Sequence, residues 1–305
     1  MSAGWVAGCV RAKALAQRRL GAGAARSLAA SPSLEAALAA LAETPYGHEV
    51  RAGQSLAQAQ RAVAATLLWH LRVLAGWLPR DGADMLRLLA GWFEIAMVDE
   101  LLHAMAGGQA EEPFRLGALA TAWPRLARAR SAQELRWTLA ASPWGDPGEA
   151  TPRALGLGMR LEWLARVAAE LERAAPWTAG AAALLVAGER FAAGRELPAL
   201  ARARSLLGPQ ALEATSLAEL VACLPARARW VLEDVAEPDE LWRGEARWWS
   251  RVERDGFALL AGASLGPAPV LGAVAVLAAD AWRVRAALEL AARGGRPLEV
   301  FDALG

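Results

Sequence analysis

Leucine and alanine are interleaved with arginine and glutamate along almost the whole chain, and these four residue types dominate the sequence. All four are strong helix formers. Runs in which valine or isoleucine alternates with polar residues, the pattern of a half-buried strand, are absent from the sequence. The pattern therefore predicts an all-α fold.

Hydroxyl residues and glycines mark the expected helix ends. Ser131 with Glu134, and Ser216 with Glu219, have the spacing of a capping box. Ser31 followed by proline is typical of a helix start. Helices are expected to stop at Gly47, Gly107, Gly108, Gly145, Gly208, Gly294 and Gly295.

Two sequence patterns recur along the chain. Residues 41–47 (Leu-Ala-Glu-Thr-Pro-Tyr-Gly) and 139–145 (Leu-Ala-Ala-Ser-Pro-Trp-Gly) lie 98 positions apart, and Ser33 and Ser131 keep this offset. The proline stops a helix, and the glycine permits a left-handed exit. Residues 107–114 and 294–301 share a Gly-Gly pair, a glutamate and a phenylalanine, each after a long helical stretch. With weaker copies of both patterns between residues 206 and 225, the repeats predict three related helical units, 1–115, 116–218 and 219–305.

Composition limits the class of protein. The 305 residues are 55% hydrophobic and 21% charged with a net charge of +1, which excludes a strongly basic nucleic-acid-binding protein. Two cysteines are too few for a disulfide framework and favour a reducing compartment. No residue from Phe257 to Ala279 is charged, but Pro267 and Pro269 interrupt this stretch. It is therefore expected to form two buried helical pieces rather than a membrane span.

Motifs for catalysis are weak in this sequence. Residues 262–266 have the Gly-x-Ser-x-Gly pattern of a nucleophile elbow, but no histidine follows Ser264 and no strand is predicted before it. Glu100 and His103 have the spacing of half a di-iron site, and the second half is missing. The sequence has neither a phosphate-binding loop nor a complete dinucleotide fingerprint. We therefore expect no catalytic residue, no metal site and no cofactor.

Four segments match the pattern of a known family. They are residues 10–15 (Val-Arg-Ala-Lys-Ala-Leu), the turn at 41–47, the helix from Glu94 to Met105 with the glycines after it, and the C-terminal residues 282–285 and 294–299. Together they resemble the C/d-type central-stalk subunits of V/A-type rotary ATPases, a family that includes the eukaryotic vacuolar ATPases. Where that family carries an Asp-x-x-Asn pattern and a later arginine, this sequence has Glu94, Met97 and His103, so it resembles a divergent member.

The resemblance implies a funnel-like body of three helical units in a pseudo-threefold arrangement. It implies a non-catalytic central-stalk subunit at the cytoplasmic face of the membrane, with the central shaft subunits and the membrane proteolipid ring as partners. It implies neither a nucleic acid nor a small-molecule substrate. We expect partner contacts at Arg11, Arg18 and Arg19, or at Trp248 and Trp249. Three other functions stay open for this sequence. They are a soluble helical-repeat scaffold or adaptor unrelated to rotary ATPases, an enzyme that uses Ser264 or Glu100, and an integral membrane protein.

Overall fold

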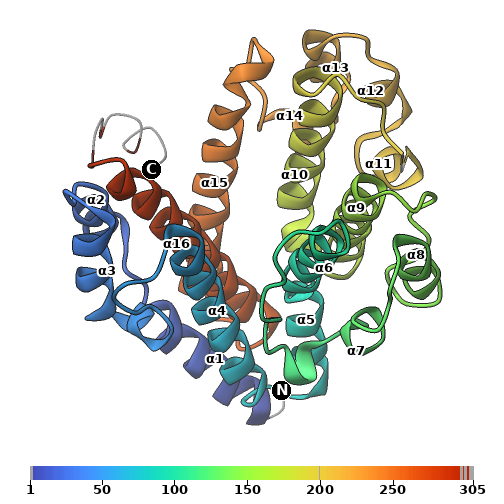
Figure 1. The fold of residues 1–305 in the computed structure, drawn as a ribbon. Coiled ribbons are helices and arrows are strands. Elements are labelled where there is room, and N and C mark those ends of the chain that lie inside the picture. Colours follow the sequence, from blue (N-terminus) through green and yellow to red (C-terminus); the bar gives the residue numbers. More distant parts are fainter. Residues whose placement is uncertain (1–2, 199, 296–297, 299–300, 302–305) are drawn as a thin grey trace. The chain divides into compact units, whose positions relative to one another are not determined.

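The computed structural model describes residues 3–198, 200–295, 298 and 301, and these residues form helices and turns with no β-strand (Figure 1). The predicted all-α fold is confirmed. The chain divides into two compact units, the first formed by Met1–Ala83 with Trp249–Gly305 and the second by Asp84–Trp248. These boundaries differ from those of the three units 1–115, 116–218 and 219–305, which come from sequence repeats rather than contacts. The threefold division and the funnel arrangement stay predictions.

The first unit is built around one long buried helix. Its elements are α1 (Ala3–Ala16), α2 (Ala22–Ala29), α3 (Leu34–Ala42), the 3-10 helix η1 (Pro45–His48), α4 (Leu56–Ala75) and α16 (Pro267–Ala292). Two more helices, α5 (Arg80–Leu89) and α15 (Leu241–Ala261), contribute residues to both units. α16 packs against α1, α2, α3 and α4. Its Val284 and Leu288 share an apolar core with Leu38, Leu41 and Val63, so α16 links the helices of this unit.

The uncharged stretch 257–279 is interrupted, as the prolines predict. It forms the end of α15, a turn over residues 262–266 and the first half of α16. Only the α16 piece is buried, because Phe257 on α15 is 37% exposed, so the expectation of two buried pieces is wrong for α15. The two helices touch through Gly256 and Gly272, where an added Cβ at Gly272 would lie 2.6 Å from the Gly256 carbonyl oxygen. Within the described residues, no helix combines the length and apolarity needed to cross a membrane.

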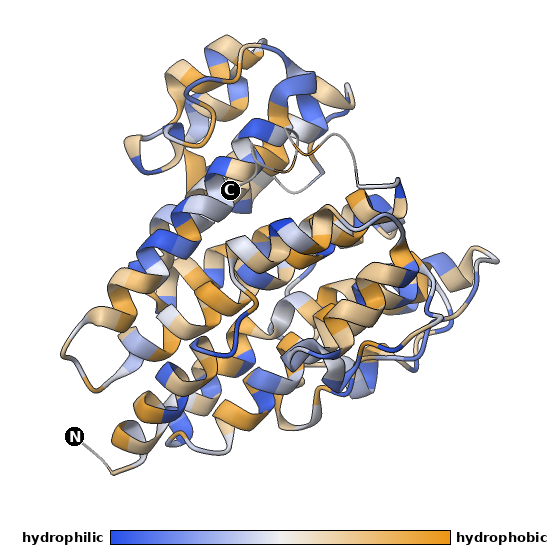
Figure 2. Cartoon of the chain, turned by 90° about the vertical axis from the view of Figure 1, so that its left-hand side faces the viewer, coloured by the Kyte–Doolittle hydropathy of each residue, from blue (hydrophilic) through white to orange (hydrophobic). Residues whose placement is uncertain are grey.

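The second unit contains most of the short helices. It comprises α6 (Gly91–Met105), η2 (Gly117–Leu119), α7 (Trp123–Leu126), α8 (Ala132–Ala140), α9 (Pro152–Glu170), η3 (Glu172–Ala174), α10 (Ala175–Ala187), the π-helix η4 (Gly188–Ala192), α11 (Leu200–Leu207), α12 (Pro209–Glu213), α13 (Leu217–Cys223), α14 (Ala226–Arg229) and η5 (Pro238–Glu240). One apolar cluster joins α9 and α10 to α11–α14, and another joins α6 to α7 and α8. In Figure 2, hydrophobic and hydrophilic positions are mixed along the helices rather than separated into apolar and polar segments.

Serine caps begin three of the predicted helices. The hydroxyls of Ser33, Ser131 and Ser216 each accept a hydrogen bond of 3.2 Å from the backbone N–H three residues later. Helix α3 therefore starts after Ser33, and the expected start at Ser31 is wrong. The predicted capping boxes form only in part, because Glu134 and Glu219 accept from Arg130 and Thr215, one residue before each cap.

Candidate functional site

A buried carboxylate on α16 holds together three segments of the first unit. Asp280 is fully buried, and its two oxygens accept hydrogen bonds of 2.8 Å from the backbone N–H groups of Leu20 and Gly21. The hydroxyl of Tyr46 donates a third bond of 2.8 Å to the same carboxylate. Gly21 is the N-cap of α2, where unpaired N–H groups attract negative charge. We call this arrangement the Asp280 clamp.

The second unit contains the same arrangement around Glu94 of α6. Glu94 is 1% exposed and accepts hydrogen bonds from the backbone N–H groups of Thr121 (2.9 Å) and Ala122 (2.8 Å), just before α7. The indole Nε1–H of Trp144 donates a third bond of 2.6 Å. We call this the Glu94 clamp. In both clamps a long helix supplies the carboxylate, a helix start supplies two backbone donors, and an aromatic ring supplies the third donor.

The aromatic donors are the ones in the repeated turns. Thr44 donates to the Leu41 carbonyl (2.6 Å) and accepts from the Tyr46 N–H (3.2 Å). The second turn repeats this pattern. Ser142 donates to the Leu139 carbonyl (2.7 Å), and its hydroxyl accepts from the Trp144 N–H (3.2 Å). The sequence repeat therefore marks one local structure that occurs in both units.

The two turn glycines do not behave alike. Gly145 has a φ of 68°, as the expected left-handed exit requires. Gly47 lies within η1 without a positive φ, so a left-handed exit there is wrong. A Cβ on Gly47 would instead lie 1.9 Å from the Ala42 carbonyl oxygen, so the close approach of the backbone explains this glycine.

The weaker third copy has no clamp. Ser216 caps α13 and Gly208 precedes α12 with a φ of 86°, close to the 82° of Gly21. Among the described residues, no carboxylate accepts from the start of α12, where Ala211 and Leu212 pack instead into the apolar cluster of the second unit. Among the described residues, the start of α12 is therefore held by apolar packing and not by a carboxylate.

The Asp280 clamp changes the acidity of Tyr46. Burial raises the pKa of the phenol well above its usual value, and the charge of Asp280 and the hydrogen bond to it raise the pKa further. Nearby Arg283 opposes this shift, and it also forms two hydrogen bonds with Glu253 of α15, at 3.0 and 2.6 Å. The clamp therefore keeps Tyr46 neutral as a hydrogen-bond donor, which suits a structural role.

Sequence reasoning did not single out Asp280. A signal was available, since Asp280 is the first charged residue after the uncharged stretch and precedes Gly294 by 14 positions. Glu94 precedes Gly107 by 13 positions, so the two acids occupy nearly equivalent places before the repeated Gly-Gly pairs. The spacing shows where the carboxylates recur, but their hydrogen-bond partners come from distant segments.

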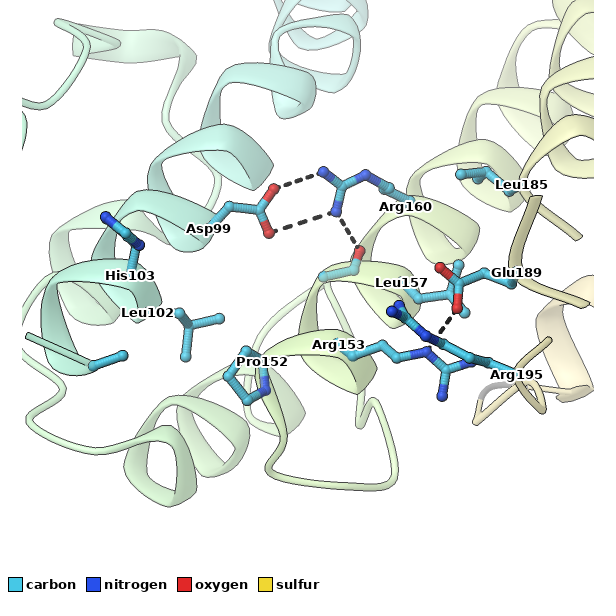
Figure 3. Close-up of a pocket in the computed structure, with 12 residues that line it drawn as sticks. Asp99, Leu102, His103, Pro152, Arg153, Leu157, Arg160, Leu185, Glu189 and Arg195 are labelled. Carbon is cyan, nitrogen blue, oxygen red and sulfur yellow. Dashed lines mark hydrogen bonds and ion pairs between the residues drawn. The ribbon is translucent and has the colours of Figure 1, made fainter. Parts of the chain in front are cut away.

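A charged groove of about 520 Å³ lies on the second unit (Figure 3). It is lined from α6, α9, α10, η4 and the segment after η4. Asp99 of α6 pairs with Arg160 of α9 at 2.6 Å, and Arg153 of α9 pairs with Glu189 at 2.6 Å. Gly156 allows the first pair, because a Cβ there would lie 2.8 Å from Oδ1 of Asp99. These charges neutralise one another across the walls of the groove.

The groove includes one residue of the half di-iron pattern. His103 is exposed at its edge, and its ring covers Gly108, where a Cβ would lie 2.1 Å from Nε2. Within the residues that the structure describes, no three histidine, cysteine, aspartate or glutamate side chains are grouped closely enough to hold a metal ion.

Ser264 lies in the turn between α15 and α16, at a corner between two helices.

The three predicted contact arginines lie at or just after α1. Arg11 is half-buried, with its guanidinium 5.8 Å from the centre of the Trp77 ring. Arg18 is exposed in the turn that follows α1. Arg19 donates to the Ala16 carbonyl at 3.1 Å and lies 4.8 Å from the centre of the Phe257 ring. Their role as partner contacts stays a prediction.

The predicted tryptophan pair is only partly available to a partner. Trp248 is half-buried, donates its Nε1–H to the Trp177 carbonyl at 2.7 Å and packs against Gly180 in the second unit. Trp249 belongs to the first unit and stacks on Trp282, with ring centres 5.5 Å apart. Other tryptophans are more exposed, and sequence spacing did not single them out as surface residues: Trp77 (52%), Trp92 (47%), Trp137 (62%) and Trp242 (43%).

No protein-family model and no characterised protein matches this sequence significantly. The resemblance to the C/d-type central-stalk subunits of rotary ATPases therefore stays a prediction that comes from the sequence motifs.

Proposed function

We propose that this chain is a non-catalytic central-stalk subunit of a V/A-type rotary ATPase. In this role it couples the rotating shaft to the membrane proteolipid ring, at the cytoplasmic face of the membrane. ATP hydrolysis takes place in other subunits, and this chain passes torque to the ring that moves ions. Neither a cofactor nor a small-molecule substrate is part of the proposal.

The observation that carries the proposal is the recurrence of the carboxylate clamp. Asp280 in the first unit and Glu94 in the second join the same three kinds of segment through the same kinds of donor. This internal repetition supports the similarity to the C/d-type family, whose build is itself repetitive. Of the family-like segments, the turn at 41–47 and the helix that carries Glu94 are both parts of clamps.

The clamps also give the chain a property that a rotor subunit needs. A part that transmits torque must resist deformation, and hydrogen bonds to buried charges are among the stronger polar contacts in proteins. Each clamp fixes a helix start and a turn to a long helix, and the residues of the surrounding apolar clusters are buried. Local rigidity of this kind supports a mechanical role.

The proposal is tested by affinity purification of the tagged chain from mildly solubilised native membranes, followed by mass spectrometry. We expect shaft subunits, proteolipid and ATPase-head subunits in constant proportion. Recovery of a well-expressed chain alone, or with unrelated partners, would show that the rotor assignment is wrong and would favour an unrelated helical scaffold.

Charge-reversal variants locate the contact surface in the same experiment. Arg18→Glu combined with Arg19→Glu is expected to reduce recovery of the shaft or the ring. The matched control is Arg128→Glu, since Arg128 is an exposed arginine after α7 in the second unit. Equal recovery with both variants would show that these arginines are not part of the proposed interface. The rotor assignment itself would still be decided by the purification with the unsubstituted chain.

A further inference from the structure

Two nitrogen atoms near α1 are buried without a hydrogen-bond partner. They are Nε of Arg11 and Nδ1 of His70, a residue of α4 that is 5% exposed. α1 packs against α4, so the two side chains belong to neighbouring helices. Buried polar atoms are nearly always hydrogen-bonded in folded proteins, and an orphaned donor costs free energy. An external acceptor would remove this cost for Nε of Arg11, and for Nδ1 of His70 in the tautomer that carries the proton there.

The side chains that lower the pKa of His70 electrostatically are all basic. Arg18, His48 and Arg11 all lower the pKa of His70 electrostatically, in that order, after the larger effect of burial. His48, on η1, lies 3.1 Å from Glu49, and its ring packs against Trp69, the neighbour of His70. Arg18 forms no hydrogen bond or ion pair within the described part of the chain. Basic side chains close enough to lower the pKa of a buried imidazole can also stabilise an anion bound near it.

The N-terminal segment is basic and partly apolar, and Asp81 of α5 accepts a hydrogen bond of 3.2 Å from the indole of Trp5 on α1. Residues 1–34 contain no acidic residue and five cations, namely Arg11, Lys13, Arg18, Arg19 and Arg26. Val6 (40%), Val10 (63%) and Trp77 (52%) are exposed on α1 and just after α4. Exposed aliphatic side chains and tryptophan beside basic residues are typical of surfaces that lie against anionic lipids.

We propose that Arg11, Arg18 and His70 bind a phosphate group, either free or carried on the headgroup of an anionic lipid. Two guanidiniums and an imidazole supply enough N–H donors for several oxygens of one phosphate. The orphaned nitrogens of Arg11 and His70 would then have an acceptor. This site does not depend on the rotor assignment, because a membrane-bound chain of any function could use it.

The first arm of the test measures His70 by NMR, with inorganic phosphate as the probe. The chain has three histidines, so a His70→Gln variant identifies the signal. We expect the pKa of His70, which is about 4 in the free protein, to rise when phosphate is added, since a bound anion favours the imidazolium. The rise is expected to be lost in Arg18→Gln, a substitution of an exposed side chain that leaves the fold intact.

The second arm measures binding to phosphatidylglycerol vesicles, with phosphatidylcholine vesicles as the reference. Arg18→Gln is expected to weaken binding to phosphatidylglycerol by about fivefold. The charge-matched control Arg285→Gln, at an exposed position of α16, is expected to change it less than twofold. If inorganic phosphate raises the pKa of His70 and the vesicles do not bind, the ligand is a free phosphate. If the chain binds phosphatidylglycerol vesicles selectively, the ligand is a lipid headgroup. If phosphate leaves His70 unchanged and Arg18→Gln behaves like Arg285→Gln, the proposed site is wrong.

Discussion

Removal of the Asp280 carboxylate is expected to loosen the first unit. Asp280→Ala leaves three donors without an acceptor, namely the N–H groups of Leu20 and Gly21 and the hydroxyl of Tyr46. A hydrogen bond to a charged group contributes about 1.5–3 kcal/mol, and the low end applies because the substitution also removes a buried charge. With three bonds at about 1.5 kcal/mol each, we therefore expect a loss of about 4.5 kcal/mol in the free energy of unfolding.

Two further variants divide this value among the bonds. Asp280→Asn keeps one oxygen acceptor and is expected to cost less than Asp280→Ala. Tyr46→Phe removes a single donor and is expected to cost about 1.5 kcal/mol in the unsubstituted chain. In the Asp280→Ala background the same change removes an orphaned hydroxyl, so it is expected to cost nothing or to stabilise the protein.

Urea unfolding followed by circular dichroism measures these changes, and hydrogen exchange locates them. Protection is expected to fall over residues 20–46 in Asp280→Ala. The exposed control Asp239→Ala is expected to stay within about 0.5 kcal/mol of the unsubstituted chain. Equal costs for Tyr46→Phe in both backgrounds, or a loss below about 1 kcal/mol for Asp280→Ala, would refute the clamp.

Three more predictions follow from single sites. Tyr46 is the only tyrosine, so ultraviolet absorbance of tyrosinate should show no ionisation near pH 10 in the folded protein. The stability due to this raised pKa is present below about pH 10 and is lost as the pH rises further. Ionisation of Tyr46 near pH 10 would contradict its burial. The pKa of His70 falls from 6.5 to about 4, so stability should fall as the pH drops through this range. His70→Gln should reduce that dependence in acid unfolding, and an unchanged pH profile would exclude His70 as its source. Gly272→Ala should lower the free energy of unfolding in urea by about 1–3 kcal/mol, because the added methyl group forces α16 away from Gly256. Gly23→Ala has open space around it and should raise the free energy of unfolding by about 0.5–1 kcal/mol. Equal effects of the two substitutions would contradict the close helix contact.

Local chemistry in the sequence predicts the helices and their ends. The serine at each cap acts within three residues, and the turns at 41–47 and 139–145 owe their shape to their own threonine or serine. These contacts are readable because both partners lie in one short segment. Even so, Ser31 and Ser33 compete for one helix start, and only the structure decides between them.

Contacts between distant segments could not be predicted in the same way. Tyr46 and Asp280 are 234 positions apart, and no property of either residue identifies the other. The sequence also does not show which tryptophans are exposed. Trp248 is half-buried against Gly180, while Trp242, on the same helix, is 43% exposed. Both outcomes depend on how the helices pack.

The central claim is that this chain couples ATP hydrolysis to ion transport without catalysing either step. It is tested most directly in membrane vesicles from cells that lack the chain, with ATP hydrolysis and ATP-driven ion uptake measured together. The account predicts that hydrolysis persists, that uptake is lost, and that expression of the chain restores uptake. Ion uptake at the normal rate in the absence of the chain would contradict it.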